Sequence, residues 1–216
     1  MEIPAEAFDE ILKELSRQPL ELNKYMKKVG DGRSQAFGVV GRRCLPVDYS
    51  RQCWRRAYLY KLLLDFGAKY VNIPWNAITV NQNYQAKPHY DRHNVGDSFL
   101  VAFGDYTGGE LVIHEGPKAG TWDIRHRAIQ DNFSKCLHEV KPFSGTRVSL
   151  VYYNYSVPEG ISLPPPSVRQ HENKRWVFYR GEEAITTGLP HPLAGRKKGA
   201  EGGYHVEEKT TTIEFS

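Results

Sequence analysis

The chain has 216 residues, a length that suits one domain. Its hydrophobic content of 40% and charged content of 25% are ordinary for a globular protein and argue against a disordered chain. The net charge of +4 permits a polyanionic partner such as nucleic acid without requiring one. Its three cysteines show no paired short spacings, which excludes a disulfide framework and a zinc signature.

We expect no membrane-spanning segment and no signal peptide. The chain has no run of about 18 apolar residues, and its acidic, amphipathic N-terminus lacks the apolar stretch of a secretory signal. The odd cysteine count favours a reducing compartment. We therefore expect an intracellular protein, cytoplasmic or nuclear.

Helical patterns are expected in the first third of the chain. Residues 4–16 carry apolar side chains at helical spacing, with a proline and acids near the start, which predicts a helix. Residues 17–29 suggest a turn and a second short helix, and residues 36–40 a strand. The main helix is expected over residues 51–66, ended by Gly67. Its core-facing stripe is predicted to consist of Trp54, Tyr58, Leu62 and Phe66.

From about residue 76 the pattern changes to short β-type runs. These runs are AITVNQNY, SFLVAFG, GELVIHE, TWDIR, KCLHEV and RVSLVYYNY. Gly, Pro, Asp and Asn separate them at roughly ten-residue spacing, which is typical of an all-β sandwich or jelly roll. We predict an α+β, mainly β protein forming one domain over residues 1–216. It has helices at about 1–70 packed on a β core at about 76–156, followed by a C-terminal extension at about 157–216.

The C-terminal extension begins with a proline-rich connector, PEGISLPPPS, and continues with charged and Gly-rich segments. Two runs within it, RWVFYR and TTTIEF, are expected to form strands. The sequence leaves open whether this extension packs on the β core.

The first chemical signal is a His-x-Asp pair, His89 and Asp91. On a strand, alternate side chains share a face, so the two would point together and Tyr90 would face away. One imidazole and one carboxylate supply two ligands of a facial triad, and the third is expected from a distant histidine. The pair is a weak signal when taken alone.

The second signal begins at His138 and strengthens the first. A Pro-x-x-Gly turn follows it, and then a strand is expected to open with Arg147 and Ser149 on one face. An arginine offers a planar fork that pairs bidentately with a carboxylate, and the serine hydroxyl adds a hydrogen bond. The pattern predicts a site for a dicarboxylic acid whose other end chelates the metal, which describes 2-oxoglutarate.

In this order, His-x-Asp, the Gly-Gly-Glu-Leu segment at residues 108–111, His138 and Arg-x-Ser resemble the 2-oxoglutarate/Fe(II) dioxygenase superfamily. The resemblance covers about residues 78–155. It implies a double-stranded β-helix, a form of jelly roll, with Fe(II), 2-oxoglutarate and molecular oxygen as cofactors and ascorbate as a reductant. The residues it places at the metal are His89, Asp91 and His138. The residues it places at the co-substrate are Arg147, Ser149, Asn81, Asn83 and Tyr84.

The implied reaction converts 2-oxoglutarate to succinate and CO2 and hydroxylates a substrate C–H bond. The run from His89 to Ser98 and the ending Pro-Phe-x-Gly-x-Arg-x-Ser-Leu-Val-Tyr-Tyr are similar to microbial enzymes near the TET/JBP group, which oxidise methyl groups of pyrimidine bases in nucleic acid. Arg92 and Asn94 follow the metal-binding pair and are candidates for contact with such a substrate. The same chemistry on a small metabolite or a protein side chain is the alternative.

Several other interpretations remain open. His114 or His126 could replace His138 as the third ligand, and His89 with His93 has the i,i+4 spacing of zinc hydrolases, although the flanking Pro and Gly argue against a helix. A second triad-like pair, His205 and Glu207, lies in the charged tail. Arg147 could be a surface residue in an ordinary ion pair.

Basic segments and the reaction class leave two further alternatives. Basic residues that could contact phosphates are Arg42, Arg43, Arg55, Arg56 and residues 196–198; more often such residues form a solvated face. A β-barrel binding module that has lost catalysis is the competing class of function.

Overall fold

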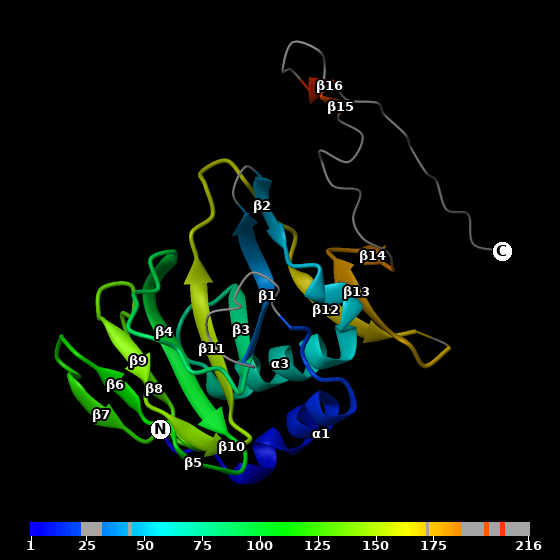
Figure 1. The fold of residues 1–216 in the computed structure, drawn as a ribbon. Helices are drawn as coiled ribbons and strands as arrows, with labels where there is room; N and C mark the ends of the chain where they lie inside the picture. The colour runs from blue at the N-terminus through cyan, green and yellow to red at the C-terminus, as the bar shows by residue number, and fades with distance from the viewer. Residues whose placement is uncertain (23–31, 43–44, 172, 187–196, 199–203, 206–216) are drawn as a thin grey trace.

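A six-stranded antiparallel sheet lies at the centre of the fold (Figure 1). Its strands are β1 (Arg33–Arg42), β2 (Leu45–Tyr49), β3 (Ala77–Gln82), β4 (Asn94–Phe103), β8 (Ile129–Asp131) and β11 (Val148–Tyr155). They are ordered β2-β1-β3-β11-β4-β8, so neighbours in space are mostly distant in sequence. The structure, a computed structural model, describes residues 1–22, 32–42, 45–171, 173–186, 197–198 and 204–205.

The N-terminal helix expected over residues 4–16 is confirmed. A short 3-10 helix, η1 (Ala5–Phe8), leads into α1 (Asp9–Arg17), which turns Ile11 and Leu15 into the core. The strand expected at 36–40 is also confirmed and is longer, because pairing with β3 and β2 extends from Arg33 to Arg42, with an irregularity between Val40 and Arg42. Most of the helix suggested over 17–29 lies outside the described residues.

The main helix differs from the prediction in two ways. It is broken into α2 (Gln52–Arg55) and α3 (Ala57–Tyr70) by Arg56, which has non-helical backbone angles and a buried guanidinium that donates to the carbonyl of Gln18. Gly67 lies inside α3 and does not end it. A Cβ at that position would come within 2.5 Å of Trp75. Gly67 is therefore required for close packing rather than for termination.

The expected core-facing stripe of the helix is only partly right. Phe66 is buried, but Trp54, Tyr58 and Leu62 are only half-buried, and Leu59, Tyr60 and Leu63 take the inner positions. Tyr58 stacks on Trp176 of the C-terminal extension, with ring centroids 5.4 Å apart. The stripe faces a second layer of protein that could not be foreseen from this segment alone.

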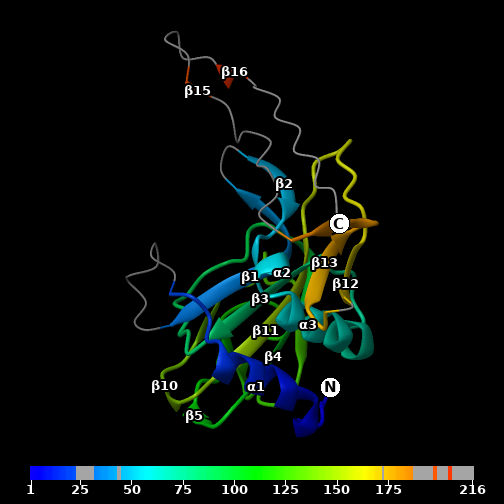
Figure 2. The same cartoon turned by 90° about the vertical axis from the view of Figure 1, so that its right-hand side faces the viewer.

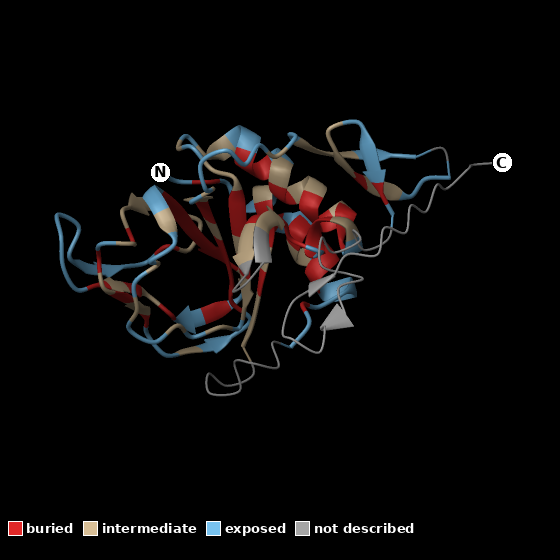
Figure 3. Ribbon diagram, turned by 90° about the horizontal axis from the view of Figure 1, so that it is seen from above, coloured by how far each residue is buried: buried red, intermediate tan, exposed pale blue. Residues whose placement is uncertain are grey.

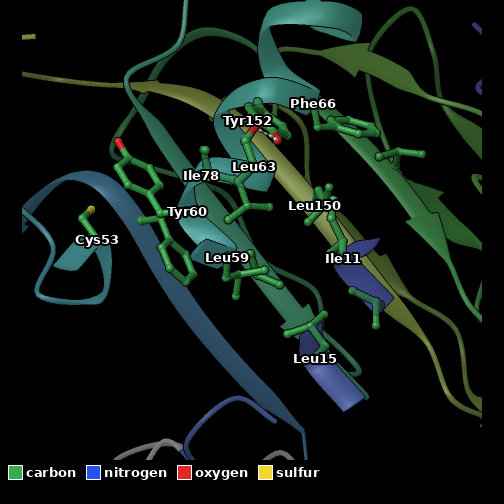
Figure 4. Close-up of a cluster of buried hydrophobic side chains, with 14 of the residues drawn as sticks. Ile11, Leu15, Cys53, Leu59, Tyr60, Leu63, Phe66, Ile78, Leu150 and Tyr152 are labelled. Atoms are coloured by element: carbon green, nitrogen blue, oxygen red, sulfur yellow. Dashed lines mark hydrogen bonds between the residues drawn. The ribbon is translucent and has the colours of Figure 1, made fainter. Parts of the chain in front are cut away.

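Helices α1 and α3 cover one face of the central sheet, and the apolar core fills the space between them (Figures 2 and 3). Alternate residues of the sheet point into this core, among them Ile78 of β3 and Leu150 and Tyr152 of β11 (Figure 4). The buried Tyr152 hydroxyl donates to the carbonyl of Leu63 at 2.7 Å, so this polar group is satisfied inside the apolar layer.

The other face of the central sheet meets smaller antiparallel sheets. One is ordered β7-β6-β9 and the other pairs β5 with β10. Their strands are β5 (Tyr106–Gly108), β6 (Leu111–Ile113), β7 (Gly120–Trp122), β9 (His138–Val140) and β10 (Phe143–Gly145). A second apolar cluster joins them to β4 and comprises Leu100, Ala102, Tyr106, Leu111, Ile113, Ile124, Ile129, Phe133 and Cys136. The fold is thus mainly β, and each predicted β run of the core contributes a strand.

Part of the C-terminal extension packs on the core. Strands β12 (Pro166–Gln170), β13 (Trp176–Arg180) and β14 (Glu183–Ile185) form a sheet, and Phe178 and Ile185 enter the main core. The predicted strand RWVFYR is therefore confirmed as β13. Beyond it, β15 (Lys197–Lys198) pairs with β16 (Tyr204–His205), and the run TTTIEF lies outside the described residues.

Two observations bear on the expectations from composition. Cys53 and Cys136 are both free and buried, in agreement with the absence of a disulfide framework among the described residues. None of the helices described here combines the length and the hydropathy needed to cross a membrane.

Candidate active site

Backbone pairing brings the two candidate metal-binding histidines, His89 and His138, together. His89 and His138 form an antiparallel bridge in which each backbone N–H donates to the other residue's carbonyl, at 3.0 and 3.1 Å. Side chains of directly paired residues project from the same face. The two imidazole centroids consequently lie 4.2 Å apart, although the residues are 49 positions apart in the chain.

The second nitrogen of each imidazole is held by the backbone. Nδ1 of His89 lies 2.7 Å from the carbonyl of Lys87, and Nδ1 of His138 lies 3.0 Å from the carbonyl of Cys136. A carbonyl can only accept, so in the neutral form of each ring Nδ1 carries the proton and Nε2 keeps its lone pair. This outer contact is the usual way in which proteins orient a metal-binding histidine.

Both Nε2 atoms face the carboxylate of Asp91. His89 Nε2 lies 3.5 Å from Oδ1 and His138 Nε2 lies 4.0 Å from Oδ2, and the three donor atoms all lie within 4.8 Å of one another. Two ligands about 2.1 Å from a common ion can be at most about 4.2 Å apart. The distances to Asp91 therefore fit one first-row metal ion, and two imidazoles with one carboxylate form the donor set of a facial triad.

The site is closed on one side and open on the other. The side chain of His138 is 4% exposed, whereas those of His89 and Asp91 are 41% and 26% exposed. The carboxylate of Asp91 accepts a hydrogen bond from the protonated imidazole of His89 and so raises the pKa of His89, with burial opposing it; burial lowers the pKa of His138. The buried histidine is thus kept neutral, the form that binds a metal.

Asp91 is fixed by its own neighbours. Its backbone N–H donates to the carbonyl of Phe133 at 3.0 Å. Asn94 Nδ2 donates to Asp91 Oδ2 at 3.3 Å and to the hydroxyl of the fully buried Ser98 at 3.0 Å. Asn94, which the sequence suggested for contact with substrate, therefore supports a metal-ligand candidate directly.

The local geometry of the His-x-Asp segment differs from the strand that was expected. His89 is a single bridge residue, and Asp91 lies outside the named strands. The alternation nevertheless holds, because Tyr90 points to solvent and its hydroxyl donates to Glu115 at 2.6 Å.

The other histidines of the described chain lie elsewhere. His114 pairs with Glu139 at 2.9 Å and His126 stacks on Phe8. His93 stacks on Tyr155 rather than forming a helical pair with His89. Glu207, the partner suggested for His205, lies outside the described residues. The candidate metal centre thus contains His138 and neither of its two alternatives.

Arg147 is buried, with 2% of its surface exposed. Its Nε has no hydrogen-bond partner, and no carboxylate forms an ion pair with it among the residues that the structure describes. Burial lowers the pKa of this guanidinium, but an arginine keeps its charge in proteins. A buried cation without a carboxylate partner is costly, so this end of the site is suited to an anionic ligand.

Ser149 belongs to a polar row that crosses three strands. Ser149 of β11 pairs with Asn81 of β3, which pairs with Ser34 of β1, and Asn81 Nδ2 donates to the Ser149 hydroxyl at 3.3 Å. Ser149, the first residue of this row, is two positions after Arg147, which itself lies just before the start of β11 at Val148. The sequence did not indicate Ser34, since only the pairing of β1 with β3 brings it to the site.

Asn83 takes a different place from that expected. It follows the end of β3 and has a positive φ of 52°, so it does not continue the strand face of Asn81. Its Oδ1 accepts the backbone N–H of Arg147 at 2.9 Å, and its own N–H donates to the Arg147 carbonyl at 2.8 Å. Asn83 therefore fixes the backbone of Arg147 and does not line the cavity.

A single cavity of about 220 Å³ joins the metal centre to Arg147. Its polar lining comprises Ser34, Thr79, Asn81, Tyr84, His89, Asp91, Asn94, His138, Arg147, Ser149 and Tyr153, and its apolar lining Ala86, Leu100, Leu111, Ile124, Val140 and Val151. Asn94, which is bonded to Asp91, pairs with the last residue of β11, whereas Arg147 precedes the first. The metal centre and the arginine thus lie towards opposite ends of this strand.

The remaining predicted contacts are less close to the cavity. Arg92 is exposed and does not line it. Arg55 pairs with Glu21 at 3.8 Å on the surface, and the buried Arg56 is unavailable to a phosphate. The side chains of Arg42, Arg43 and residues 196–198 lie outside the described part of the chain.

No family model and no curated protein matches the sequence. Solved structures similar to the chain include an oxidoreductase of the 2OG-Fe(II) oxygenase family from Burkholderia pseudomallei, with 19% identity over 68% of this chain and 76% of that chain and a TM-score of 0.48. NgTET1 in complex with 5mC DNA matches with 16% identity over 71% of this chain and 69% of that chain and a TM-score of 0.49. A Pseudomonas putida prolyl-4-hydroxylase matches with 14% identity over 71% and 89% and a TM-score of 0.44. At these scores the likenesses do not decide an activity, so the function is inferred from the site.

Proposed function

We propose that the chain is an Fe(II)- and 2-oxoglutarate-dependent dioxygenase that hydroxylates a C–H bond. The observation that carries the proposal is the pairing, in one cavity, of a His-Asp-His donor set with a buried arginine that has no carboxylate partner in the described structure. A metal centre alone would suit many reactions. A metal centre facing an unpaired guanidinium suits a ligand that chelates at one end and carries an anion at the other.

We infer a double-stranded β-helix for the core, in which the central sheet and the smaller sheets on its inner face are the two halves. The chain would then be one dioxygenase domain. The N-terminal helices and the described part of the C-terminal extension would support the central sheet from outside, as their shared apolar core suggests.

His89, Asp91 and His138 would hold the iron, each through the atom that already faces the others. Bound iron and 2-oxoglutarate supply the oxidative step, in which 2-oxoglutarate, O2 and a substrate C–H group become succinate, CO2 and a C–OH group, with one oxygen atom in succinate and one in the alcohol. The carboxylate of Asp91 keeps its orientation through Asn94.

The other lining residues would bind and orient the co-substrate. Arg147 would take the distal carboxylate in a bidentate pair, with the Ser149 hydroxyl as a further donor. Asn81 orients that hydroxyl, and Tyr84 lines the same cavity. Apolar side chains such as Leu111 and Val140 would cover the methylene carbons and exclude water from the reacting end.

The primary substrate is inferred from sequence alone. The motif resemblance of residues 89–98 and 142–153 and the net charge of +4 favour a methylated pyrimidine base in nucleic acid. A panel containing methylated DNA, small metabolites and peptides, assayed by mass spectrometry for the gain of one oxygen atom, separates the candidates. If only a metabolite or a peptide gains oxygen, nucleic acid is excluded as the substrate.

The reaction class is tested by measuring succinate release from purified protein supplied with Fe(II), ascorbate, O2 and 2-oxoglutarate. We expect release by the wild type and by His114→Ala, whose imidazole pairs with Glu139 outside the site. We expect none from His138→Ala. Succinate release that persists in His138→Ala would refute the ligand set, and a wild type that binds no metal would favour a non-catalytic binding module.

A further inference from the structure

The two-stranded sheet of β5 and β10 lies directly against Arg147. In its register Tyr106 pairs with Gly145 and Phe143 pairs with Gly108, and the two rings make an edge contact with centroids 6.3 Å apart. The Cζ atom of Arg147 lies 5.5 Å from the centroid of the Tyr106 ring and 5.8 Å from that of the Phe143 ring. Both distances are within the range of a cation–π interaction.

The chain is shaped to allow this approach. Gly109, which follows β5, has a positive φ of 74°, and a Cβ there would lie 3.0 Å from both Cδ and Nε of Arg147. This is closer than ordinary van der Waals contact, so with any other residue here the Arg147 side chain would have to shift by a few tenths of an ångström. The Gly-Gly segment noted in the sequence thus makes room for the arginine side chain.

Tyr106 is itself held firmly. It is 3% exposed, and the guanidinium carbon of Arg125 lies 4.1 Å from its ring centroid. Arg125 also donates to the backbone carbonyl of Tyr106. The ring is therefore a fixed surface against which Arg147 can rest.

We propose that Tyr106 is the positioning residue of Arg147, so that it sets the affinity for the co-substrate without touching it. The inference rests on the proposed function, in which Arg147 binds the distal carboxylate. Tyr106 is absent from the lining of the cavity, so its effect would pass through the arginine.

An aromatic support has a specific advantage at this place. An aspartate or glutamate would also hold the guanidinium, but it would neutralise the charge and compete with the carboxylate of the ligand. A ring face orients the cation and leaves its charge available. Because the arginine is then already in its binding rotamer, less side-chain freedom is lost when the dicarboxylate binds.

The test is calorimetric titration of 2-oxoglutarate into the full chain loaded with Mn(II), which binds the same donors without turnover. We expect Tyr106→Leu to raise the Kd for 2-oxoglutarate roughly tenfold and Tyr106→Phe, which keeps the ring, to change it less than about twofold. The Kd for Mn(II) should be unchanged in both. With Fe(II), KM for 2-oxoglutarate should rise while kcat at saturation is kept.

A matched control is Tyr179→Leu. The Cζ atom of Arg169 also lies over a tyrosine ring, 4.9 Å from the centroid of Tyr179. This pair, however, belongs to the β12–β13–β14 sheet. We expect this variant to bind 2-oxoglutarate like the wild type. If Tyr106→Leu does not fold, Phe143→Leu at the half-buried second ring tests the same platform, with an expected rise of about threefold.

The outcomes separate the inference from the proposed function. If Arg147→Met abolishes 2-oxoglutarate binding while Tyr106→Leu and Phe143→Leu bind like the wild type, the positioning role is wrong and the proposed function stands. A parallel loss of Mn(II) affinity in Tyr106→Leu would also overturn it, because that points to general structural damage. If Arg147→Met binds 2-oxoglutarate normally, or the wild type does not bind it, the proposed function fails and the inference fails with it.

Discussion

His89 and His138 hydrogen-bond to each other twice through their backbones and point their Nε2 atoms at the same carboxylate. The relationship of the two imidazoles is thus set by chain pairing, before any metal binds. Such preorganisation reduces the freedom that must be lost when an ion is bound.

Metal binding should depend on His138 and stabilise the fold. A ligand that binds only the folded state raises stability by about 2.7 kcal/mol at a hundred times its Kd. We expect Mn(II) or Fe(II) to raise the melting temperature of the wild type and of His114→Ala, and to leave that of His138→Ala unchanged. A metal-dependent rise in His138→Ala equal to that of the wild type would exclude this residue as a ligand.

Asn94 should tune metal affinity rather than substrate binding. Loss of an outer-shell hydrogen bond to a ligand typically weakens metal affinity about 10- to 100-fold. We therefore expect Asn94→Ala to raise the Kd for Mn(II) within that range in calorimetry. Asn72→Ala serves as the control, because the Asn72 side chain accepts a hydrogen bond from Gln130 and does not line the cavity. An unchanged Mn(II) affinity in Asn94→Ala would return this residue to the substrate-contacting role.

The role of Gly109 in leaving room for the Arg147 side chain can be tested by comparison with Gly96, a glycine of the same backbone conformation. Gly109 and Gly96 have φ values of 74° and 73°, but a Cβ would meet Arg147 at the first and nothing within 4 Å at the second. Alanine at either site carries a similar backbone cost of roughly 1–2 kcal/mol. We expect both variants to lose that much unfolding free energy in denaturant titrations, and only Gly109→Ala to bind 2-oxoglutarate more weakly. Equal 2-oxoglutarate affinity in the two variants would contradict the contact.

The protein should lose stability in alkali. Burial raises the pKa of Cys53 from 9.0 to about 12 and that of Tyr49 from 10.0 to about 12. The unfolded chain therefore releases these protons at a lower pH than the folded chain, so stability present below pH 9 is lost as the pH rises towards 12. Each group contributes a slope of about 1.4 kcal/mol per pH unit within its own window.

The measurement is chemical denaturation at a series of pH values, with Cys53→Ala as the comparison. Because the window of Cys53 opens first, we expect the variant to show a shallower loss in the range between pH 9 and 10. A flat unfolding free energy across that range in the wild type would show that the thiol is not held protonated by the fold.

The site residues that belong to a distinctive motif could be predicted from the sequence. The residues that reach the site only through contacts between distant segments could not. In the sequence, the Arg-x-Ser pattern of Arg147 and Ser149 predicted His138 as the third ligand. The structure places these three residues in one cavity, although β10 intervenes and Arg147 precedes β11. Ser34 reaches the same cavity only through the register of β1 against β3, which no local pattern encodes.

Local rules also failed where tertiary contacts override them. Gly67 has the sequence context of a helix end, but it lies within α3 because Trp75 and Tyr152 pack against it. Asn83 was expected beside Asn81 on a regular strand, but its positive φ turns it to the backbone of Arg147. The position of Gly67 is decided by residues distant along the chain, and that of Asn83 by an unusual backbone angle.

The most direct test of the central claim is the fate of isotopically labelled O2. The protein is incubated with Fe(II), ascorbate, 2-oxoglutarate and labelled O2 in unlabelled water, and the succinate is examined by mass spectrometry. We predict one labelled oxygen atom in each succinate, from the wild type and not from Asp91→Ala. Succinate that carries no label, or label that appears equally with Asp91→Ala, would contradict the assignment of this site as a 2-oxoglutarate dioxygenase.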